Sequence, residues 1–172
     1  MKAPAVAATI LRPLQPSDRD RVEAITRAVG LFRDDEIPVA LEVFQATAAG
    51  TDTYEGVAAE SDGVLVGWAS WGLVPCTLWT FDLYWIVVDP ACHGAGIGSQ
   101  MLREMERRVA GRARMVCVET AGRTDYAATR AFYERHGYHV AATIPDYYAA
   151  GDDQVTFVKR LGLDGGGRRS EK

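Results

Sequence analysis

The sequence predicts an α/β fold in which a mixed β-sheet carries helices on both of its faces. Two observations support this fold class. Segments with the alternation or short apolar runs of strands are interspersed with segments of helical periodicity, in the order β-α-α-β-β-β-α-β-α-β-β. Hydrophobic residues make up 48% and charged residues 24% of the 172 residues, which are the proportions of an ordinary globular protein.

The first strand and the first two helices are expected before residue 50. Residues 5–12 alternate weakly between apolar and polar and predict a strand. The sequence Pro16-Ser17-Asp18 offers an N-cap, and apolar residues recur after it at helical spacing. A second helix begins at the acidic run Asp34-Asp35-Glu36, because the positive end of the helix dipole favours acidic side chains.

Three strands follow, and the third is the most aromatic. Residues 54–60 and 64–73 predict a hairpin, because Ser61-Asp62-Gly63 between them is a strong turn signal. Residues 78–88, LWTFDLYWIVV, predict the longest strand. We expect this strand at the centre of the sheet.

The next segment alternates between helices and a strand. After Asp89-Pro90 a glycine-rich turn leads into a helix, whose apolar residues between Ile97 and Val109 share one face. Residues 114–119, RMVCVE, predict a short buried strand. Thr124-Asp125 then caps another helix, which ends at Gly137.

The chain closes with two strands and a tail. Residues 138–144 and 154–161 predict the strands, and PDYYAAGDD between them predicts a loop. We expect residues 1–163 to form a single domain, since this length suits one domain of ordinary size. Residues 164–172, DGGGRRSEK, are expected to be a disordered tail.

Charge and composition exclude several classes of protein. The net charge of −4 argues against a nucleic-acid binder, and no apolar run is long enough to span a membrane. Cys76, Cys92 and Cys117 form no Cys-x-x-Cys pair and no His/Cys cluster. We therefore expect reduced thiols that pack as small core residues, no metal, and a cytoplasmic protein.

The glycine-rich turn between Val88 and Ser99 predicts a site for phosphate groups. Glycines let the backbone approach a ligand closely, and the following helix adds the positive end of its dipole. A P-loop is excluded, because no Lys follows Gly98. A dinucleotide-binding fold is disfavoured, because the glycine spacing differs and only about 50 residues follow the strand that ends at Glu119.

Two motifs make the chain resemble the GNAT superfamily of N-acetyltransferases. The residues from His93 to Gly98, which follow Val88-Asp89-Pro90, are similar to its [QR]-x-x-G-x-[GA] signature, with His93 in place of Gln or Arg. Residues 127–138, AATRAFYERHGY, resemble its second motif, with Tyr126 where Asn is common. The resemblance implies a mostly antiparallel mixed sheet and transfer of an acetyl group from acetyl-CoA to a primary amine.

The resemblance also implies where acetyl-CoA binds. The loop N–H groups would hold the pyrophosphate, and the end of the preceding strand, which bulges in this superfamily, would pair with the pantetheine arm. The implied cofactor-binding residues are Ile86, Val87, Val88, His93, Gly94, Ala95, Gly96, Ile97, Gly98, Ser99 and Thr129.

Three residues are candidates for proton transfer. Tyr133 is the candidate acid for the leaving thiolate, and its helical position predicts a side chain that points away from the core. Asp82 is the first candidate for the base, because an acid within an apolar strand should have a raised pKa. Glu119 is the second candidate, and a base that acts through water stays open.

The acceptor is expected between the first two helices and the last hairpin. The candidate substrate-binding residues are Leu31, Phe32, Tyr84, Tyr147 and Tyr148. The Tyr-Tyr pair and the following acids are similar to a hairpin of acetyltransferases that act on protein N-termini.

Three functions therefore compete: acetylation of a small amine or amino acid, acetylation of a protein N-terminus, and a catalytically silent acyl-CoA-binding domain. The sequence leaves open whether the chain forms a homodimer. No nucleic-acid or membrane partner is expected.

Overall fold

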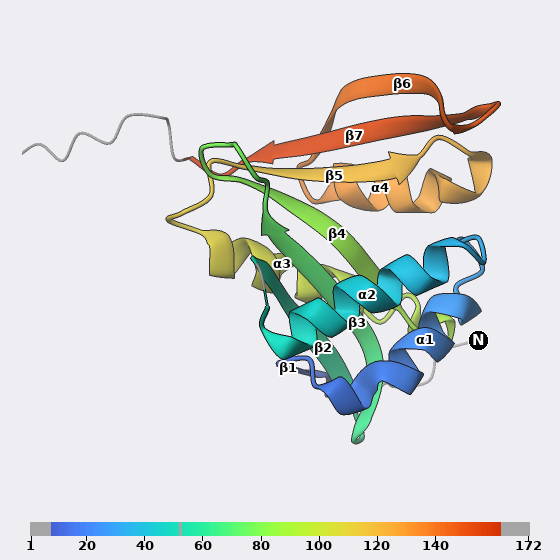
Figure 1. Cartoon of the computed structure of the whole chain (residues 1–172), viewed down its shortest axis with the longest axis vertical. Helices are drawn as coiled ribbons and strands as arrows, with labels where there is room; N and C mark the ends of the chain where they lie inside the picture. The colour runs from blue at the N-terminus through green and yellow to red at the C-terminus, as the bar shows by residue number, and fades with distance from the viewer. Residues whose placement is uncertain (1–7, 52, 163–172) are drawn as a thin grey trace, which may run out of the picture. The chain divides into compact units, whose positions relative to one another are not determined.

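The computed structural model describes residues 8–162 apart from residue 52, and it confirms the predicted order of helices and strands (Figure 1). The expected disordered tail, 164–172, and residues 5–7 of the first predicted strand lie outside the described residues. The elements are β1 (Ile10–Arg12), α1 (Arg19–Ala28), α2 (Glu36–Ala49), β2 (Tyr54–Ser61), β3 (Val64–Leu73), β4 (Thr80–Val88), α3 (Ile97–Val109), β5 (Met115–Ala121), α4 (Ala127–Arg135), β6 (His139–Ala149) and β7 (Asp152–Arg160).

The strands hydrogen-bond in the order β1-β2-β3-β4-β5-β7-β6, with β4 in the middle as predicted. The pairs β1–β2, β2–β3, β5–β7 and β6–β7 are antiparallel, whereas β4 and β5 are parallel. The sheet is therefore mixed and mostly antiparallel, as the sequence led us to expect.

The chain divides into two compact units. The first unit comprises Met1–Gly72 and Leu83–Arg108, and the second comprises Leu73–Asp82 and Val109–Lys172. The first unit thus holds β1, β2, α1, α2, most of β4, and β3 and α3 apart from the last residue of each, whereas the second holds the start of β4, the strands β5 to β7 and α4. The single domain over residues 1–163 stays a prediction.

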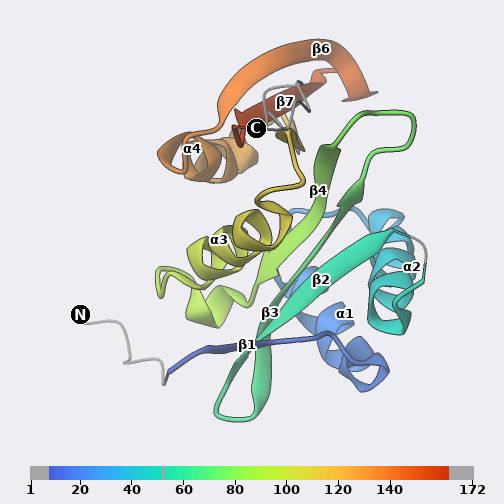
Figure 2. The same ribbon diagram turned by 90° about the vertical axis from the view of Figure 1, so that its left-hand side faces the viewer.

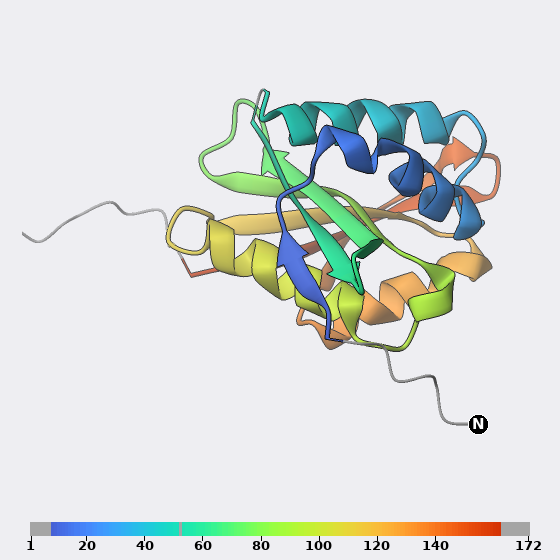
Figure 3. The ribbon, with the colours of Figure 1, turned by 90° about the horizontal axis from the view of Figure 1, so that it is seen from below.

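Helices cover both faces of the strands in the first unit (Figures 2 and 3). Two successive residues of β3 show this arrangement. The buried Trp68 donates from Nε1 to Thr26 Oγ1 of α1 at 3.1 Å. On the opposite face, a Cβ placed on Gly67 would lie 3.0 Å from Met101 Cε of α3. Helices on both faces are therefore confirmed for this unit.

Aromatic rings form the centre of the first unit's core. Phe44 of α2 packs edge-on against Trp68, with ring centroids 6.1 Å apart. Trp85 of β4 stacks on the other side of Trp68 at 6.1 Å, and Phe32 lies 4.9 Å from Trp85. Burial of each large apolar side chain contributes roughly 1.5–3 kcal/mol to the free energy of unfolding. The apolar stripes predicted on α1 and α2 face this cluster and are buried against it.

In the second unit, α4 covers one face of β5 and β7. The Tyr133 ring of α4 lies 5.8 Å from the ring of Phe157 on β7. Phe157 pairs with Val118, so both side chains lie on the helix face. Glu119 and Thr156, the next pair, therefore lie on the opposite face, because side chains alternate along a strand.

The last hairpin differs from its prediction. Strand β6 extends to Ala149, so Tyr147 and Tyr148 lie in a strand and not in a loop. Pro145 suggested a loop, but β6 is an edge strand, where a missing N–H breaks no ladder bond. The register shifts between Ile144 and Ala149, which indicates a bulge that accommodates the proline.

The expectation that every cysteine packs in the core is wrong for Cys76. Its side chain is exposed, and the residue lies in the connection between β3 and β4, where its φ is 61°. Cys92 and Cys117 are half-buried, and all three are free thiols. A small apolar residue favours the core only where the chain passes through it, and this connection lies at the surface.

Candidate active site

The glycine-rich loop of the first unit has a backbone that requires glycine at two positions. Gly94 and Gly96 have φ angles of 82° and 79°, in the left-handed region. A Cβ placed on either residue would meet nothing within 4 Å among the described residues. Glycine is therefore required here by the backbone conformation and not by crowding, and the space beside the loop is open to a ligand.

The loop and the first turn of α3 present a row of N–H groups with no acceptor in the described part of the chain. Within the loop, the Cys92 N–H donates to the Asp89 carbonyl at 2.8 Å, and Ala95 N–H donates to the Cys92 carbonyl at 3.3 Å. The first bond of the helix runs from Gln100 N–H to the Gly96 carbonyl at 3.0 Å. The N–H groups left over belong to Gly94, Gly96, Ile97, Gly98 and Ser99.

These residues fit a pyrophosphate. Several convergent N–H groups at the positive end of a helix dipole are the usual means of binding phosphate oxygens without a basic side chain. The open space beside Gly94 and Gly96 leaves room for such a group. The loop can therefore hold the pyrophosphate of coenzyme A.

An arginine of α1 holds the start of the loop. Arg21 donates from Nε to the Leu65 carbonyl at 2.9 Å and from Nη2 to Asp89 Oδ2. Asp89 Oδ1 in turn accepts the Ala91 N–H at 2.9 Å, and the Asp89 N–H donates to the Val66 carbonyl at 2.8 Å. Asp89 therefore links α1, β3 and the loop, and fixes where the loop leaves β4.

The side chain of His93 folds back onto the strand that precedes the loop. His93 Nε2 lies 3.0 Å from the Val88 carbonyl oxygen, so this ring nitrogen carries the proton and donates. Gln or Arg, which the signature favours at this position, would reach farther. The structure thus gives His93 a role in closing the loop, and its predicted contact with the cofactor stays untested.

Strand β4 bulges at Tyr84 and Trp85. The Tyr84 ring packs edge-on against Tyr54 at 5.4 Å, and Trp85 stacks on Trp68. Tyr54 pairs with Gly72, and Trp68 pairs with Ala58, which lies four residues after Tyr54 on β2. Because side chains alternate along a strand and paired residues share a face, Tyr54 and Trp68 lie on one face of the β2–β3 hairpin. Two successive side chains of β4 therefore share a face, which a regular strand does not allow. This bulge agrees with the one that the resemblance implies.

Two acidic side chains and a thiol share the face of the second unit that lies opposite α4, here called the acidic face. The parallel ladder pairs Asp82 with Cys117, and Glu119 follows two residues later on the same face. Burial, with the charge of Glu119 added to it, raises the pKa of Asp82 to about 6. Burial and both carboxylates raise the pKa of Cys117 to about 11, so its thiol stays protonated at neutral pH. The predicted pKa shift of Asp82 is confirmed in direction and cause.

Tyr133 does not point away from the core, as its helical position had suggested. Its side chain is 2% exposed and packs against Phe157 and Tyr138, with ring centroids 5.8 and 5.7 Å away. The prediction was wrong because α4 lies with this stripe against β7 and leaves Ala128 exposed instead. Burial raises the pKa of the Tyr133 hydroxyl, which therefore keeps its proton at neutral pH.

The candidate substrate-binding residues fall into two groups. In the first unit, Phe32 packs on Trp85, Leu31 is half-buried, and Tyr84 is 37% exposed. In the second unit, Tyr148 makes a side-chain hydrogen bond with Gln154, and Tyr147 packs edge-on against Tyr148 at 5.0 Å. Burial also raises the pKa of the Tyr148 hydroxyl.

Sequence reasoning missed two residues that the structure singles out. Arg21 looked like one of many charged residues on an amphipathic helix, and only the fold shows that it reaches Asp89. Asp152 looked like part of an acidic loop, yet it is 5% exposed at the start of β7. The sequence carried no signal for the burial of Asp152, because a polar residue that alternates with apolar ones is expected to face away from the core.

Comparison with known proteins agrees with this geometry. Residues 52–140 match the family model of the acetyltransferase (GNAT) domain. The blasticidin-S acetyltransferase of Streptomyces morookaense is 34% identical over 121 residues, which cover 66% of this chain and 83% of that protein.

Two solved structures extend the comparison to the fold. A protein assigned to the GNAT family from Desulfovibrio desulfuricans superposes with a TM-score of 0.83 at 34% identity, over 90% of this chain and 99% of that one. The yncA protein of Salmonella typhimurium, solved with acetyl-CoA, superposes with a TM-score of 0.72 at 20% identity, over 94% and 99%.

The chain belongs to the GNAT family of acetyltransferases. It is an enzyme that takes its acetyl group from acetyl-CoA. This assignment favours the enzyme over the silent acyl-CoA-binding domain.

The described residues lack two features. No helix there is both long and apolar enough to cross a membrane. No group of three or more His, Cys, Asp or Glu side chains there could hold a metal ion. The cytoplasmic location and the homodimer stay predictions.

Proposed function

We propose that the enzyme transfers the acetyl group directly to a primary amine of a small molecule. The observation that carries this proposal is the pair Asp82 and Glu119 on one face of the second unit, with a pKa of about 6 for Asp82. An amine must lose a proton to attack a thioester, and a carboxylate with this pKa is largely ionised at neutral pH.

The first unit supplies the residues that hold acetyl-CoA. The N–H groups between Gly94 and Ser99 bind the pyrophosphate. The backbone of Ile86–Val88, after the bulge, pairs with the amide groups of the pantetheine arm. The contact predicted for Thr129, which is half-buried on α4 of the second unit, stays a prediction. Acetyl-CoA supplies the activated acetyl group.

The second unit supplies the residues that move protons. Asp82 accepts the proton of the amine, and Glu119 is the alternative acceptor, directly or through a water molecule. Tyr133 lies on the α4 face of β5 and β7, opposite the face of Asp82 and Glu119, and donates a proton to the thiolate that leaves, since its hydroxyl remains protonated at neutral pH.

A small-molecule acceptor is favoured by the relative at 34% identity, which is named for its action on blasticidin-S. A protein N-terminus is the second candidate, because Tyr147 and Tyr148 are similar to a hairpin of acetyltransferases that act on protein N-termini. Tyr147 is 54% exposed and therefore accessible to a peptide.

Release of the coenzyme A thiol tests the proposal. We would measure the rate with acetyl-CoA and a panel of free amines, amino acids, amine-bearing antibiotics and short peptides with free N-termini. We expect release with free amines to exceed release with peptides at equal concentration. A higher rate with peptides would assign the protein N-terminus, and no release above hydrolysis with any acceptor would contradict both candidates.

A further inference from the structure

A buried carboxylate at the tip of the second unit has one oxygen that nothing in the described chain satisfies. The Asp152 residue is 5% exposed, and its Oδ1 atom is buried with no hydrogen-bond partner. Its Oδ2 atom accepts from Arg123 Nη1 at 3.2 Å. A buried carboxylate oxygen without a donor is unfavourable, so this atom requires a donor that the described part of the chain does not supply.

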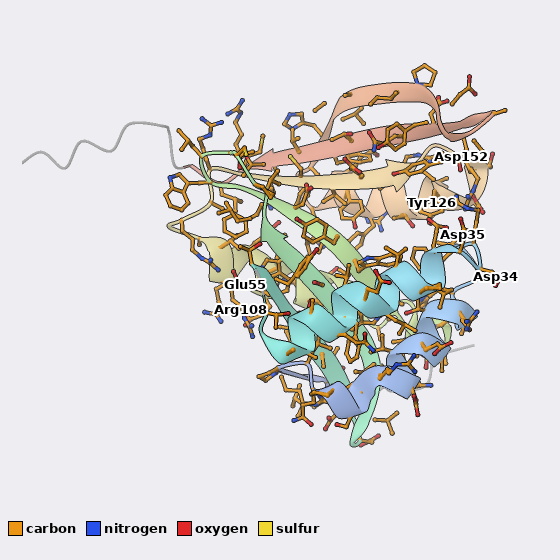
Figure 4. The ribbon with its side chains drawn as sticks, viewed as in Figure 1. Asp34, Asp35, Glu55, Arg108, Tyr126 and Asp152 are labelled. Atoms are coloured by element: carbon orange, nitrogen blue, oxygen red, sulfur yellow. The ribbon has the colours of Figure 1, made fainter. Side chains whose placement is uncertain are left out.

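Arg123 does not neutralise Asp152 fully, because it is shared. Its Nε donates to Asp125 Oδ1 at 3.2 Å, and its guanidinium lies 5.0 Å from the centre of the Tyr126 ring. Tyr126 and Asp152 lie at the same end of the second unit (Figure 4). The Oδ1 atom of Asp152, which Arg123 leaves unsatisfied, therefore suits a cationic donor.

Asp152 shares a face of the sheet with the proposed base. Ala121 pairs with Gln154 and Glu119 with Thr156, so alternation places Asp152 on the face that also carries Glu119 and Asp82. Asp152 is four residues along β7 from the partner of Glu119, which corresponds to about 13 Å at 3.3 Å per residue. The two acidic positions are therefore separated by the length of an extended small molecule.

We propose that Asp152 binds a second cationic group of the acceptor, so that the substrates are amines with another ammonium or guanidinium group roughly a dozen Å from the reacting nitrogen. This inference rests on the proposed function, because it takes Asp82 and Glu119 as the place where the reacting amine loses its proton. The second cation completes the hydrogen bonds of Asp152 Oδ1 and selects long diamines over amines with a neutral end.

The test compares acceptors that differ only at the far end. Linear α,ω-diamines with two to ten carbons are compared with amino alcohols of the same length, by thiol release. We expect a KM at least tenfold lower for 1,8-diaminooctane than for 8-aminooctan-1-ol, and no such ratio for the two-carbon pair. Asp152→Asn keeps an oxygen for Arg123 and should abolish the ratio.

Asp153→Asn is the matched control. It removes one charge from the next residue, whose side chain lies on the other face of β7 and whose Oδ1 accepts the Asp146 N–H at 3.0 Å. The ratio should persist in this variant. A wild-type enzyme that does not distinguish the two eight-carbon acceptors overturns the inference, whether or not Asp152→Asn folds, and so does a ratio that survives in Asp152→Asn.

Failure of the proposed function gives a different result. If no amine releases thiol above hydrolysis, calorimetric titration of 1,8-diaminooctane into the wild type and Asp152→Asn still tests the site. Binding that weakens at least tenfold in Asp152→Asn but not in Asp153→Asn supports the cation site without the reaction. Equal binding by all three proteins, or none by the wild type, contradicts it.

Discussion

The loop of the first unit and the acidic face of the second unit are proposed to bind their ligands by different means. The loop offers backbone N–H groups from Gly94 to Ser99, and none of these donors depends on a side chain. The acidic face offers the carboxylates of Asp82, Glu119 and Asp152. A backbone site restricts only the residues that need special φ angles, whereas a side-chain site changes chemistry with each substitution. The loop therefore suits the constant acetyl donor, and the face suits an acceptor that varies between relatives.

The largest effect is expected for a substitution in the loop, which should weaken acetyl-CoA binding. Gly96→Asp places a side chain at a φ of 79° and a negative charge among the N–H donors. We expect the dissociation constant for acetyl-CoA to rise more than 100-fold, measured by calorimetry, because both strain and charge oppose binding. Gly63→Ala, at a φ of 75° in the β2–β3 turn, carries the strain without the charge and should leave affinity intact. Equal affinity in Gly96→Asp would place the cofactor elsewhere.

Tyr133→Phe tests the second unit. The change removes the hydroxyl and keeps the ring against Phe157, so kcat should fall about 100-fold while acetyl-CoA affinity is kept. Tyr138→Phe removes a hydroxyl from the neighbouring ring and should keep kcat within about twofold. If single-turnover rates of the two variants match, Tyr133 has no part in proton transfer.

Asp82→Asn should lower kcat/KM about tenfold at neutral pH, because Glu119 can partly replace the lost base. In the wild type, kcat/KM should rise with pH through about 6, as Asp82 loses its proton. The pH profile of the variant should lack this step. A step that persists in Asp82→Asn but disappears in Glu119→Gln would transfer the role of base to Glu119.

The stability of the same variant provides an independent check on the raised pKa. The pKa of Asp82 is about 6 in the folded state and 3.8 as its ordinary value, so the folded state holds the proton more tightly. Ionisation between pH 4 and 7 therefore destabilises the folded state, and Asn does not ionise. The variant should gain about 1–2 kcal/mol over the wild type from pH 4 to 7, measured by urea unfolding. A gain that is independent of pH would contradict the shift.

The smallest effect tests whether a side chain supports the backbone site. Arg21→Met removes the donor that holds Asp89 and leaves every loop N–H in place. We expect acetyl-CoA affinity to fall about threefold, because the loop must then be ordered on binding. Arg27→Met, which breaks exposed ion pairs with Glu23 and Asp34 away from the loop, is the control. A tenfold loss in Arg21→Met would mean that the loop depends on this side chain as much as on its glycines.

The order of helices and strands could be predicted because each element carries a clear local pattern. The loop residues also followed from the sequence, since glycines at a strand–helix junction have few other uses. Tyr133 shows where local pattern fails, because helical spacing gives the stripe but not the element that the stripe contacts. Packing of α4 on Phe157 decides that question.

The contacts of Arg21 and Asp152 could not be read from the sequence at all. Arg21 meets Asp89, which is 68 residues away, and Asp152 meets Arg123, which is 29 residues away. Such pairs form because the sheet brings distant segments together, and a single sequence contains no signal for that pairing. The bulge after Pro145 was missed for a similar reason, since proline is tolerated only because β6 is at the edge.

The placement of the four tryptophans gives the two units separate optical signals. Trp68, Trp71 and Trp85 belong to the first unit, where Trp68 and Trp85 stack with ring planes 16° apart. Trp79 belongs to the second unit and is 54% exposed. Near-ultraviolet dichroism therefore reports the packing of the first unit, while quenching of the exposed indole by iodide reports Trp79. After Trp79→Phe, the remaining fluorescence follows the unfolding of the first unit alone, so a difference between its stability and that of the second unit becomes measurable in the intact chain.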